Sequence, residues 1–249
     1  MGGDTEWFED EEFWTTYAPL MFDETTWGEV PQVVDGIEKL TRLRRGASVL
    51  DLCCGVGRHA IEFAARAYKV TGIDITAAYL EAARESAMAA SLDIEYLRQD
   101  ARSFSRPGGF DLCVNLFTSF GYFETRDEDL ALLALCARNL IPGGHLVLET
   151  LGKEVVARDF VASEEFDRAG WRVRTEYTIV GAWEAEINRW ILERQGCRVD
   201  RSFQLRLYSG FEMKEAILGA GFSAVSIFGS LDGRPYDEKA ETLVAVARR

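Results

Sequence analysis

Short apolar segments alternate with segments of helical periodicity between residues 47 and 151. The apolar segments, which we expect to form strands, lie at 47–53, 69–75, 94–100, 110–117 and 145–151. The segments between them repeat apolar residues every three or four positions, as amphipathic helices do, at 59–67, 77–90 and 127–141. Strands that alternate with helices form parallel sheets with helices on both faces. The pattern therefore predicts an α/β fold with a doubly wound, mostly parallel, Rossmann-like sheet.

The alternation breaks after residue 152. A short helical or irregular stretch leads into segments that alternate polar and apolar residues, at 171–180, 185–194 and 197–208. A period of two predicts an antiparallel meander. The chain then returns to a helix and two strands, which brings the core sheet to seven strands. An insertion at this place lies above the C-terminal edge of the sheet, where open α/β folds bind ligands, so we interpret it as a lid or substrate wall.

The chain is thus expected to have three parts. Residues 1–45 form an N-terminal helical cover, residues 46–152 and 210–249 form the core, and residues 153–209 form the antiparallel insertion. The cover is acidic, since eleven Asp and Glu residues precede Lys39, the first basic residue. It also carries the aromatic residues Trp7, Phe8, Phe13, Trp14, Tyr17, Phe22 and Trp27. These rings either pack as an ordered cover or close over a ligand, for example a cationic one, through stacking and cation–π attraction.

Composition excludes several classes of protein. The sequence of 249 residues is 47% hydrophobic and has no apolar run of the ~18 residues that a membrane span requires. It begins without the basic and apolar regions of a secretory signal. Its five cysteines suit buried thiols in a reducing compartment better than disulfides or a zinc site, so we expect a cytoplasmic protein without a metal. The net charge of −13 makes a nucleic-acid partner unlikely, because acidic surfaces repel phosphates.

A glycine-rich turn follows the first predicted strand in the stretch "SVLDLCCGVGRHA". Such a turn brings backbone N–H groups close to a bound ligand. A dinucleotide site would have a third glycine where Ala60 stands, and a phosphate-binding P-loop would have Gly-Lys-Ser/Thr. The turn instead has an acid, Asp51, at the strand end and two glycines, Gly55 and Gly57, spaced by one residue.

These residues resemble the first motif of the class I S-adenosylmethionine (SAM)-dependent methyltransferases, an acid followed by a Gly-x-Gly-x-Gly turn. Cys53 stands where the first glycine usually does, which implies a negative φ at this residue. Asp74 ends the second strand, where the resemblance implies hydrogen bonds to the ribose hydroxyls. Asp100 follows the third strand, and Ala101 beside it is expected at the adenine edge. The last helix and strand pair resembles the family's reversed final strand.

The resemblance implies the cofactor and its contacts, whereas the acceptor pocket and the candidates for a general base are inferred from residue type and expected position, because the family does not fix the base. SAM is the expected cofactor, S-adenosylhomocysteine (SAH) is the product, and Asp51 is expected to contact the amino group. Residues expected to bind the cofactor are Trp14, Tyr17, Asp51, Cys53, Gly55, Gly57, Arg58, Asp74, Ile75, Asp100, Ala101, Asn115, Leu116 and Phe117. Residues expected in the acceptor pocket are Phe120, Tyr122, Arg206 and Tyr208. Candidates for a general base are Tyr122, Glu149 and His59, and Arg58 either holds the methionine carboxylate or forms a surface ion pair.

The sequence therefore predicts transfer of a methyl group from SAM to an oxygen or nitrogen atom of a small molecule. The segment after the fourth strand reads "NLFTSF" rather than the Asn/Asp-Pro-Pro-Tyr/Phe of enzymes that methylate DNA bases. Two alternatives stay open: a relative that binds the cofactor without turnover, and an NAD-dependent oxidoreductase. The expected oligomeric state is a monomer or a homodimer.

Overall fold

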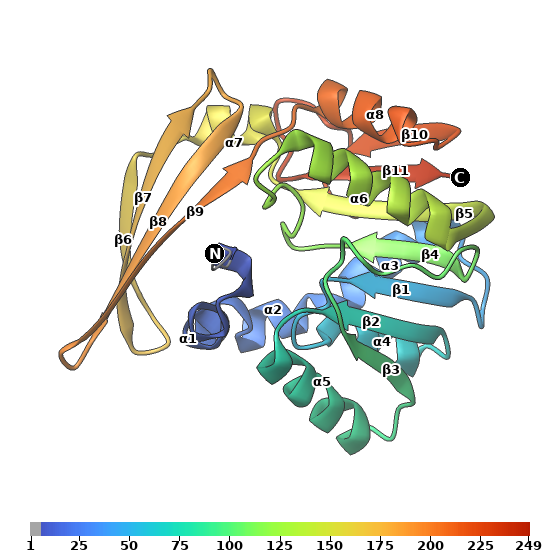
Figure 1. The fold of residues 1–249 in the computed structure, drawn as a ribbon, viewed down its shortest axis with the longest axis horizontal. Coiled ribbons are helices and arrows are strands. Elements are labelled where there is room, and N and C mark those ends of the chain that lie inside the picture. The colour runs from blue at the N-terminus through green and yellow to red at the C-terminus, as the bar shows by residue number, and fades with distance from the viewer. Residues whose placement is uncertain (1–5) are drawn as a thin grey trace, which may run out of the picture.

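The computed structural model describes residues 6–249 and contains a seven-stranded sheet in the order β10-β11-β5-β4-β1-β2-β3 (Figure 1). Its strands are β1 (Ser48–Leu52), β2 (Lys69–Asp74), β3 (Ile94–Arg98), β4 (Phe110–Asn115), β5 (Leu140–Thr150), β10 (Ala224–Phe228) and β11 (Leu243–Arg248). Of these described strands, β11 alone runs against its neighbours. The predicted doubly wound, mostly parallel sheet with a reversed final strand is confirmed.

Helices cover both faces of this sheet because its strands are apolar on both sides. One face packs on α3 (Val30–Thr41), α4 (Arg58–Ala65) and α5 (Ala77–Ala89). The other face packs on α6 (Arg126–Asn139) and α8 (Gly210–Gly219). In β1, Val49 belongs to the first core and Leu50 to the second, as the two-residue period of a strand requires. No helix within residues 6–249 has the length and apolar character to cross a membrane.

The insertion, which we call the lid, consists of one helix and a second sheet of four strands in the order β6-β7-β8-β9. Its elements are α7 (Lys153–Asp159), β6 (Ser163–Arg168), β7 (Trp171–Val180), β8 (Ala185–Arg194) and β9 (Cys197–Arg206). The meander of three strands is present, but β6 adds a fourth in the stretch expected to be helical or irregular. All residues of β6 are exposed and most are charged, so they carry no hydrophobic alternation. Its hairpin to β7 turns at Ala169 and Gly170, both with positive φ, the geometry that matches strand twist.

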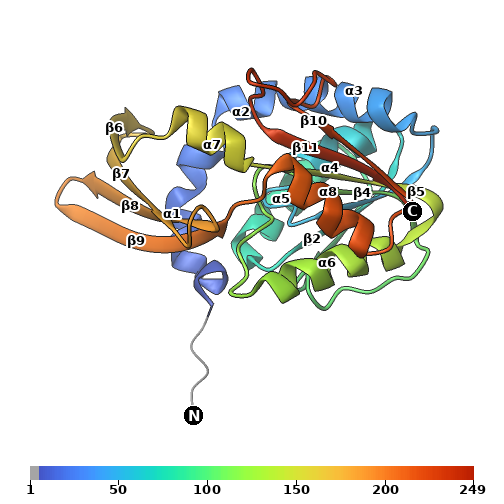
Figure 2. The ribbon, with the colours of Figure 1, turned by 90° about the horizontal axis from the view of Figure 1, so that it is seen from above.

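The N-terminal helices lie between the core and the lid (Figures 1 and 2). A short 3₁₀ turn, η1 (Trp7–Glu9), precedes α1 (Glu11–Met21) and α2 (Glu24–Gly28). Phe13, Tyr17 and Leu20 of α1 form a small apolar core with lid residues. The structure divides the expected cover, because α3 packs into the main core and the segment from η1 to α2 alone lies against the lid. We call residues 6–28 the cover.

Candidate cofactor and acceptor site

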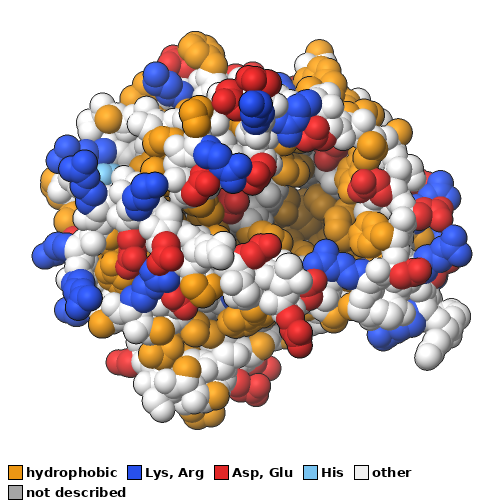
Figure 3. Space-filling model, turned by 180° about the vertical axis from the view of Figure 1, so that it is seen from behind, with side chains coloured by type: hydrophobic (Ala, Val, Ile, Leu, Met, Phe, Trp, Pro, Cys, Tyr) orange, Lys and Arg blue, Asp and Glu red, His pale blue; other side chains and the backbone are white. Residues whose placement is uncertain are grey.

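A cavity of about 510 Å³ lies at the C-terminal edge of the sheet, enclosed by the core, the cover and the lid. Figure 3 shows it as a hollow with apolar walls between the two lobes. Pockets of this size hold drug-sized ligands. On the core side it is lined by Asp51, Cys53, Cys54, Gly55, Arg58, His59, Ile73, Asp74, Ile75, Thr76, Gln99, Asp100 and Ala101. The cover contributes Phe8, Phe13, Trp14, Tyr17, Leu20, Met21, Phe22 and Thr26, helix α5 contributes Tyr79, the loop after β4 contributes Leu116, Phe117, Thr118, Ser119, Tyr122 and Phe123, and the lid contributes Arg168, Trp190 and Phe203.

The glycine-rich turn adopts left-handed backbone at three positions. Cys53 has a φ of 62°, Gly55 of 56° and Gly57 of 75°. The negative φ expected at Cys53 is therefore wrong. The chain turns directly after β1, and within this turn the N–H of Cys54 donates a hydrogen bond to the carbonyl of Ile73 on β2 at 2.9 Å. A non-glycine residue in this region costs about 1–2 kcal/mol, so the cysteine occupies a strained position that glycine would occupy freely.

Gly57 cannot be replaced without a clash. A Cβ atom there would lie 2.4 Å from the hydroxyl of Tyr96 and 2.9 Å from the Cβ of Ala83. Gly57 is also the N-cap of α4. Gly57 is not among the residues that line the cavity, so it shapes the turn through packing beneath it.

Asp51 is a buried carboxyl that faces the cavity without full hydrogen bonding. It is 2% exposed, and within residues 6–249 its Oδ2 atom has no hydrogen-bond partner. The pKa of Asp51 is raised to about 7, first by burial and then by the negative charge of Asp74. The positive charge of Arg58 opposes this rise. Leaving such an oxygen unpaired is costly. A cationic donor such as the amino group of SAM fits this oxygen, because it would supply both the missing hydrogen bond and the opposite charge.

Asp74 ties the end of β2 to the glycine-rich turn. Its Oδ2 accepts the N–H of Gly55 at 2.7 Å, and its Oδ1 accepts the N–H of Thr76 at 2.9 Å. Burial raises the pKa of Asp74, while these N–H donors lower it. Each carboxylate oxygen can accept more than one hydrogen bond, so both retain capacity toward the cavity. This arrangement fits the paired hydroxyls of a ribose.

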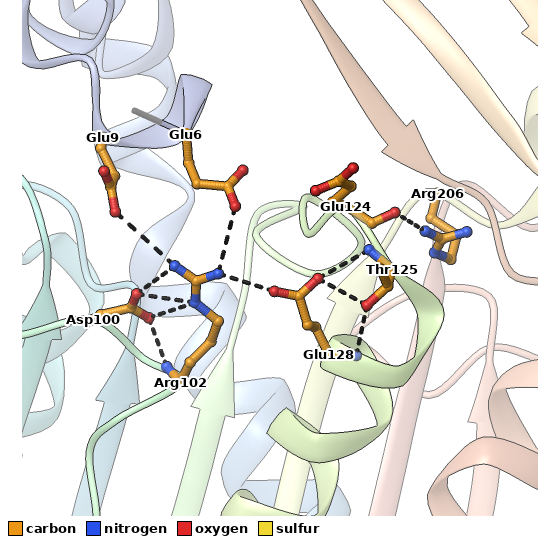
Figure 4. Close-up of polar contacts among 8 residues, drawn as sticks. All are labelled: Glu6, Glu9, Asp100, Arg102, Glu124, Thr125, Glu128 and Arg206. Carbon is orange, nitrogen blue, oxygen red and sulfur yellow. Dashed lines mark hydrogen bonds and ion pairs between the residues drawn. The ribbon is translucent and has the colours of Figure 1, made fainter. Parts of the chain in front are cut away.

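Asp100 is held by Arg102, which follows it after one residue. The Arg102 guanidinium donates to Asp100 Oδ2 at 2.7 Å from Nη2 and at 2.9 Å from Nε. The same guanidinium also contacts Glu128 of α6 and lies within 4.0 Å of carboxylates of Glu6 and Glu9 in the cover (Figure 4). Asp100 and its neighbour Ala101 both line the cavity, as expected for residues near the adenine.

The three candidates for a general base have different environments. Tyr122 lines the cavity, and burial raises the pKa of its phenol, which keeps it protonated. His59 also lines it, but burial and Arg58 lower its pKa to about 3, so its imidazole is neutral and a weak base. Glu149 lies behind the wall, where its Oε2 accepts the N–H of Phe117 at 3.1 Å. The geometry thus leaves Tyr122 as the candidate best placed to contact an acceptor.

Three residues expected in the acceptor pocket lie elsewhere. Arg206 donates from Nε to Asp129 Oδ2 at 3.1 Å, and the Tyr208 hydroxyl donates to the same oxygen at 2.8 Å. Phe120 packs against Tyr208 in the main core. None of Phe120, Arg206 and Tyr208 is among the described residues that line the large cavity. Arg206, at the end of β9, and Tyr208, two residues later, are instead bound to α6, since Asp129 belongs to that helix.

Arg58 is 5% exposed, so the surface ion pair considered for it is wrong. Its guanidinium donates to the carbonyl of Thr26 at 2.8 Å and lies 4.3 Å from the centre of the Phe117 ring. Phe117 and Thr118 both have left-handed backbone, with φ of 59° and 57°. Ile75, Leu116, Trp14 and Tyr17 line the cavity as expected, whereas Asn115 donates to the carbonyl of Leu52 beneath it.

The sequence did not identify the lid residues that reach the cavity, which are Arg168, Trp190 and Phe203. Trp190 and Phe203 share the inner face of the lid with the buried Val173 and Leu192. Alternation along each strand separates the two faces, but the pattern alone does not say which face is turned toward the core. Tyr79, also unidentified, lies on α5, and its hydroxyl donates to the carbonyl of Trp14 at 2.6 Å.

Comparison with known proteins agrees with this geometry. Residues 49–144 match a family described as "Methyltransferase domain". A dTDP-4-amino-2,3,4,6-tetradeoxy-D-glucose N,N-dimethyltransferase from Saccharopolyspora spinosa is 28% identical over 83% of this chain and 82% of its own length.

Solved structures share the fold. An S-adenosylmethionine-dependent methyltransferase from Clostridium acetobutylicum superimposes with a TM-score of 0.77 over 95% of this chain and 97% of its own, at 15% identity. SAM-bound CalS10, an amino pentose methyltransferase from Micromonospora echinaspora, has a TM-score of 0.67 over 100% of both chains, at 24% identity. These matches are to methyltransferases, so they favour methyl transfer over the alternative of an NAD-dependent oxidoreductase. The match over residues 49–144 identifies a methyltransferase domain in this chain, and the solved structures show that the chain has the fold of S-adenosylmethionine-dependent methyltransferases.

Proposed function

We propose that the protein transfers a methyl group from SAM to an amine or hydroxyl of a small molecule bound on the lid side of the cavity. One observation carries the proposal. A single cavity joins Asp74 and the Asp51 carboxyl, whose Oδ2 atom has no hydrogen-bond partner within residues 6–249, to a wall of aromatic residues from the cover and the lid. The first part fits the cofactor, and the second offers space for an organic acceptor next to it. The name of the Saccharopolyspora spinosa relative supports a small-molecule amine among the acceptors to test.

The core side of the cavity would hold SAM through groups that are already oriented. Asp51 would pair with the amino group, Asp74 would accept hydrogen bonds from the ribose hydroxyls, and Asp100 with Ala101 would border the adenine. Arg58 would attract the carboxylate. When bound, SAM supplies an electrophilic methyl: the acceptor lone pair forms the new bond, the C–S pair stays on sulfur to give SAH, and one proton leaves to water. The protein's contribution is alignment of the two reactants, which accounts for much of the acceleration in such reactions.

The lid side would orient the acceptor and exclude water. Trp14, Tyr17 and Tyr122 face the same space as the lid residues Trp190 and Phe203. The Tyr122 phenol, kept protonated by burial, can hydrogen-bond to the heteroatom of the acceptor without removing its proton. Tyr122 therefore acts as a positioning group in this proposal rather than as a general base.

Calorimetric titration with SAH tests the cofactor half. Wild-type protein should bind SAH and not NADH, and Asp74→Ala should weaken SAH binding by about tenfold or more, equivalent to ~1.4 kcal/mol. Asp93→Ala, at an exposed carboxyl outside the cavity lining, is the matched control and should bind as wild type does. Absence of SAH binding by the wild type would contradict the proposal. Binding without methylation of any amine or phenol in a broad panel would favour a relative that binds the cofactor without turnover.

A further inference from the structure

Building on the proposed function, we infer that the acceptor is a ring-bearing amine without phosphate groups. This differs from the dTDP-linked amino sugar in the name of the Saccharopolyspora spinosa relative. The inference concerns the lid side of the cavity, and it depends on three properties of that side: its apolar lining, the engagement of its cations and the acidic groups around it.

The lid side is lined mainly by aromatic and aliphatic side chains. Rings are contributed by the cover, by the loop after β4 and by the lid, through Trp14, Tyr17, Tyr122, Phe123, Trp190 and Phe203. Aromatic faces attract cations and stack on other rings, and they offer nothing to a phosphate. An ammonium group attached to a ring satisfies both preferences, since the ring stacks and the charge lies over a neighbouring face.

The cations of the cavity are already engaged. Among the described residues that line it, Arg58 and Arg168 are the basic side chains other than the neutral His59. The Arg168 guanidinium forms an ion pair with Asp23, next to α2. Arg58 donates to the carbonyl of Thr26 and stacks on Phe117 on the core side. A diphosphate is normally bound by arginine or lysine donors that point at it, or by a free helix N-terminus.

Carboxylates surround the arginines next to the cavity. Arg102 lies between Asp100, Glu128, Glu6 and Glu9, as Figure 4 shows. On the lid, Arg201 contacts Asp10 at 3.3 Å and Glu12 at 3.7 Å.

A phosphorylated acceptor that bound one of these arginines would therefore have to displace a carboxylate from it and lose its own hydration. Both steps are unfavourable. A protonated amine would meet attraction from the same carboxylates.

The test uses the protein saturated with SAH and three probes: tryptamine, indole-3-propionate and thymidine diphosphate. The first two share a ring system and differ in charge, and the third carries the diphosphate. We expect calorimetry to show tryptamine binding at least about tenfold tighter than either of the others. Tighter or equal binding of thymidine diphosphate or indole-3-propionate would overturn the inference, and so would failure of all three to bind. Failure of SAH to bind would instead contradict the proposed function.

Two tryptophan variants locate the binding. Trp190→Ala should weaken tryptamine binding about tenfold and leave SAH binding within about twofold. Trp183→Ala removes the same side chain from a lid turn outside the cavity lining, where it pairs with Phe160, and should change neither affinity. Equal effects of the two variants on tryptamine would place the binding elsewhere and overturn the inference.

Discussion

The two sides of the cavity are built from different materials. The core side consists of the ends of three neighbouring parallel strands, where Asp51, Asp74 and Asp100 lie at adjacent positions. Backbone N–H groups fix the Asp74 carboxylate, and left-handed residues fix the glycine-rich turn. These features depend on the register of the main sheet, so they cannot shift independently of it.

The lid side is assembled from separate elements. Phe13, Tyr17 and Leu20 of α1 pack on Trp171, Val173 and Leu192 of the lid in an apolar core of their own. Ion pairs of arginines and edge-to-face contacts between rings also hold these elements together. The ring centres of Trp7 and Tyr122, for example, are 4.7 Å apart.

This difference bears on how one fold can serve different binding sites. The core side is tied to the main sheet, whereas the lid side has a small apolar core of its own. Function on such folds resides in the grafted site rather than in the scaffold.

The strongest way to break the core side is Gly57→Ala. The new Cβ would lie 2.4 Å from the Tyr96 hydroxyl at a φ of +75°. We expect SAH affinity to fall by about 100-fold or more, and the free energy of unfolding to fall by about 3 kcal/mol. Gly46→Ala is the control, because Gly46 has a φ of +73° and open space around it. It should cost about 1–2 kcal/mol of stability and leave SAH binding intact. Equal SAH affinities of the two variants would contradict the role of the turn.

Asp51→Asn should change SAH affinity and the free energy of unfolding in opposite directions at high pH. Because the folded pKa of Asp51, about 7, lies above its ordinary value, the folded protein holds this proton more tightly than the unfolded chain does. Ionisation of Asp51 therefore lowers the free energy of unfolding as pH rises from about 4 to about 7. At pH 8, Asp51→Asn should be more stable than the wild type in urea titrations, by at most about 4 kcal/mol (three pH units at ~1.4 kcal/mol each), and it should bind SAH at least about tenfold more weakly.

The same carboxyl predicts the pH dependence of cofactor binding. Pairing with an ammonium requires ionised Asp51, so binding below pH 7 must release its proton. SAH affinity of the wild type should fall by up to about tenfold per pH unit below a pKa of about 7, and Asp51→Asn should lack this dependence. Titrations at several pH values check this. An unchanged slope in the variant would assign the dependence to another group.

Leu192→Ala should loosen the lid side alone. Leu192 is 0% exposed and lies in the small core between lid and cover. Removing its side chain should cost about 2–4 kcal/mol locally. In hydrogen exchange, amides of α1 and β8 should exchange faster while those of β1 and β4 stay within about threefold of wild type. Leu146→Ala, equally buried in β5 of the main sheet, should accelerate exchange throughout the core. Faster exchange of β1 in Leu192→Ala would show that the two sides form one cooperative unit.

The smallest effect is expected from the bridges between lid and cover. Arg201 is 40% exposed and pairs with Asp10 and Glu12. Exposed ion pairs contribute about 0–1 kcal/mol and weaken with salt. Arg201→Ala should therefore change the free energy of unfolding by no more than about 1 kcal/mol, and less in high salt. A loss above about 2 kcal/mol that persists at high salt would mean that this bridge, and not the apolar packing, holds the cover.

Much of the core side could be predicted from the sequence because its determinants are local. Apolar periodicity identified the strands, and the carboxyl ends of parallel strands meet at one edge of the sheet. Asp51, Asp74 and Asp100 therefore had to lie together once the strands were recognised. The negative φ predicted for Cys53 is wrong, because that prediction depends on the conformational preference of the residue alone. The structure has a turn directly after β1, in which Cys53 adopts a positive φ and the N–H of Cys54 donates to β2.

The lid side was less accessible because its contacts join segments far apart in the chain. Tyr17 donates from its hydroxyl to the carbonyl of Trp190 at 3.0 Å, across 173 positions. Arg206 and Tyr208 are predicted to line the pocket because of their side-chain types and their place in the meander. In the structure both donate hydrogen bonds to the buried Asp129 on α6 instead.

Short-range patterns of polarity and glycine were thus sufficient to predict the class of fold and the carboxylates that line the core side of the cavity. Which face of the lid points inward, which rings line the acceptor space and which arginines are already paired were decided by tertiary packing. The physical reason is that alternation along a strand separates two faces without orienting them, and an ion pair exists only when folding brings its partners together.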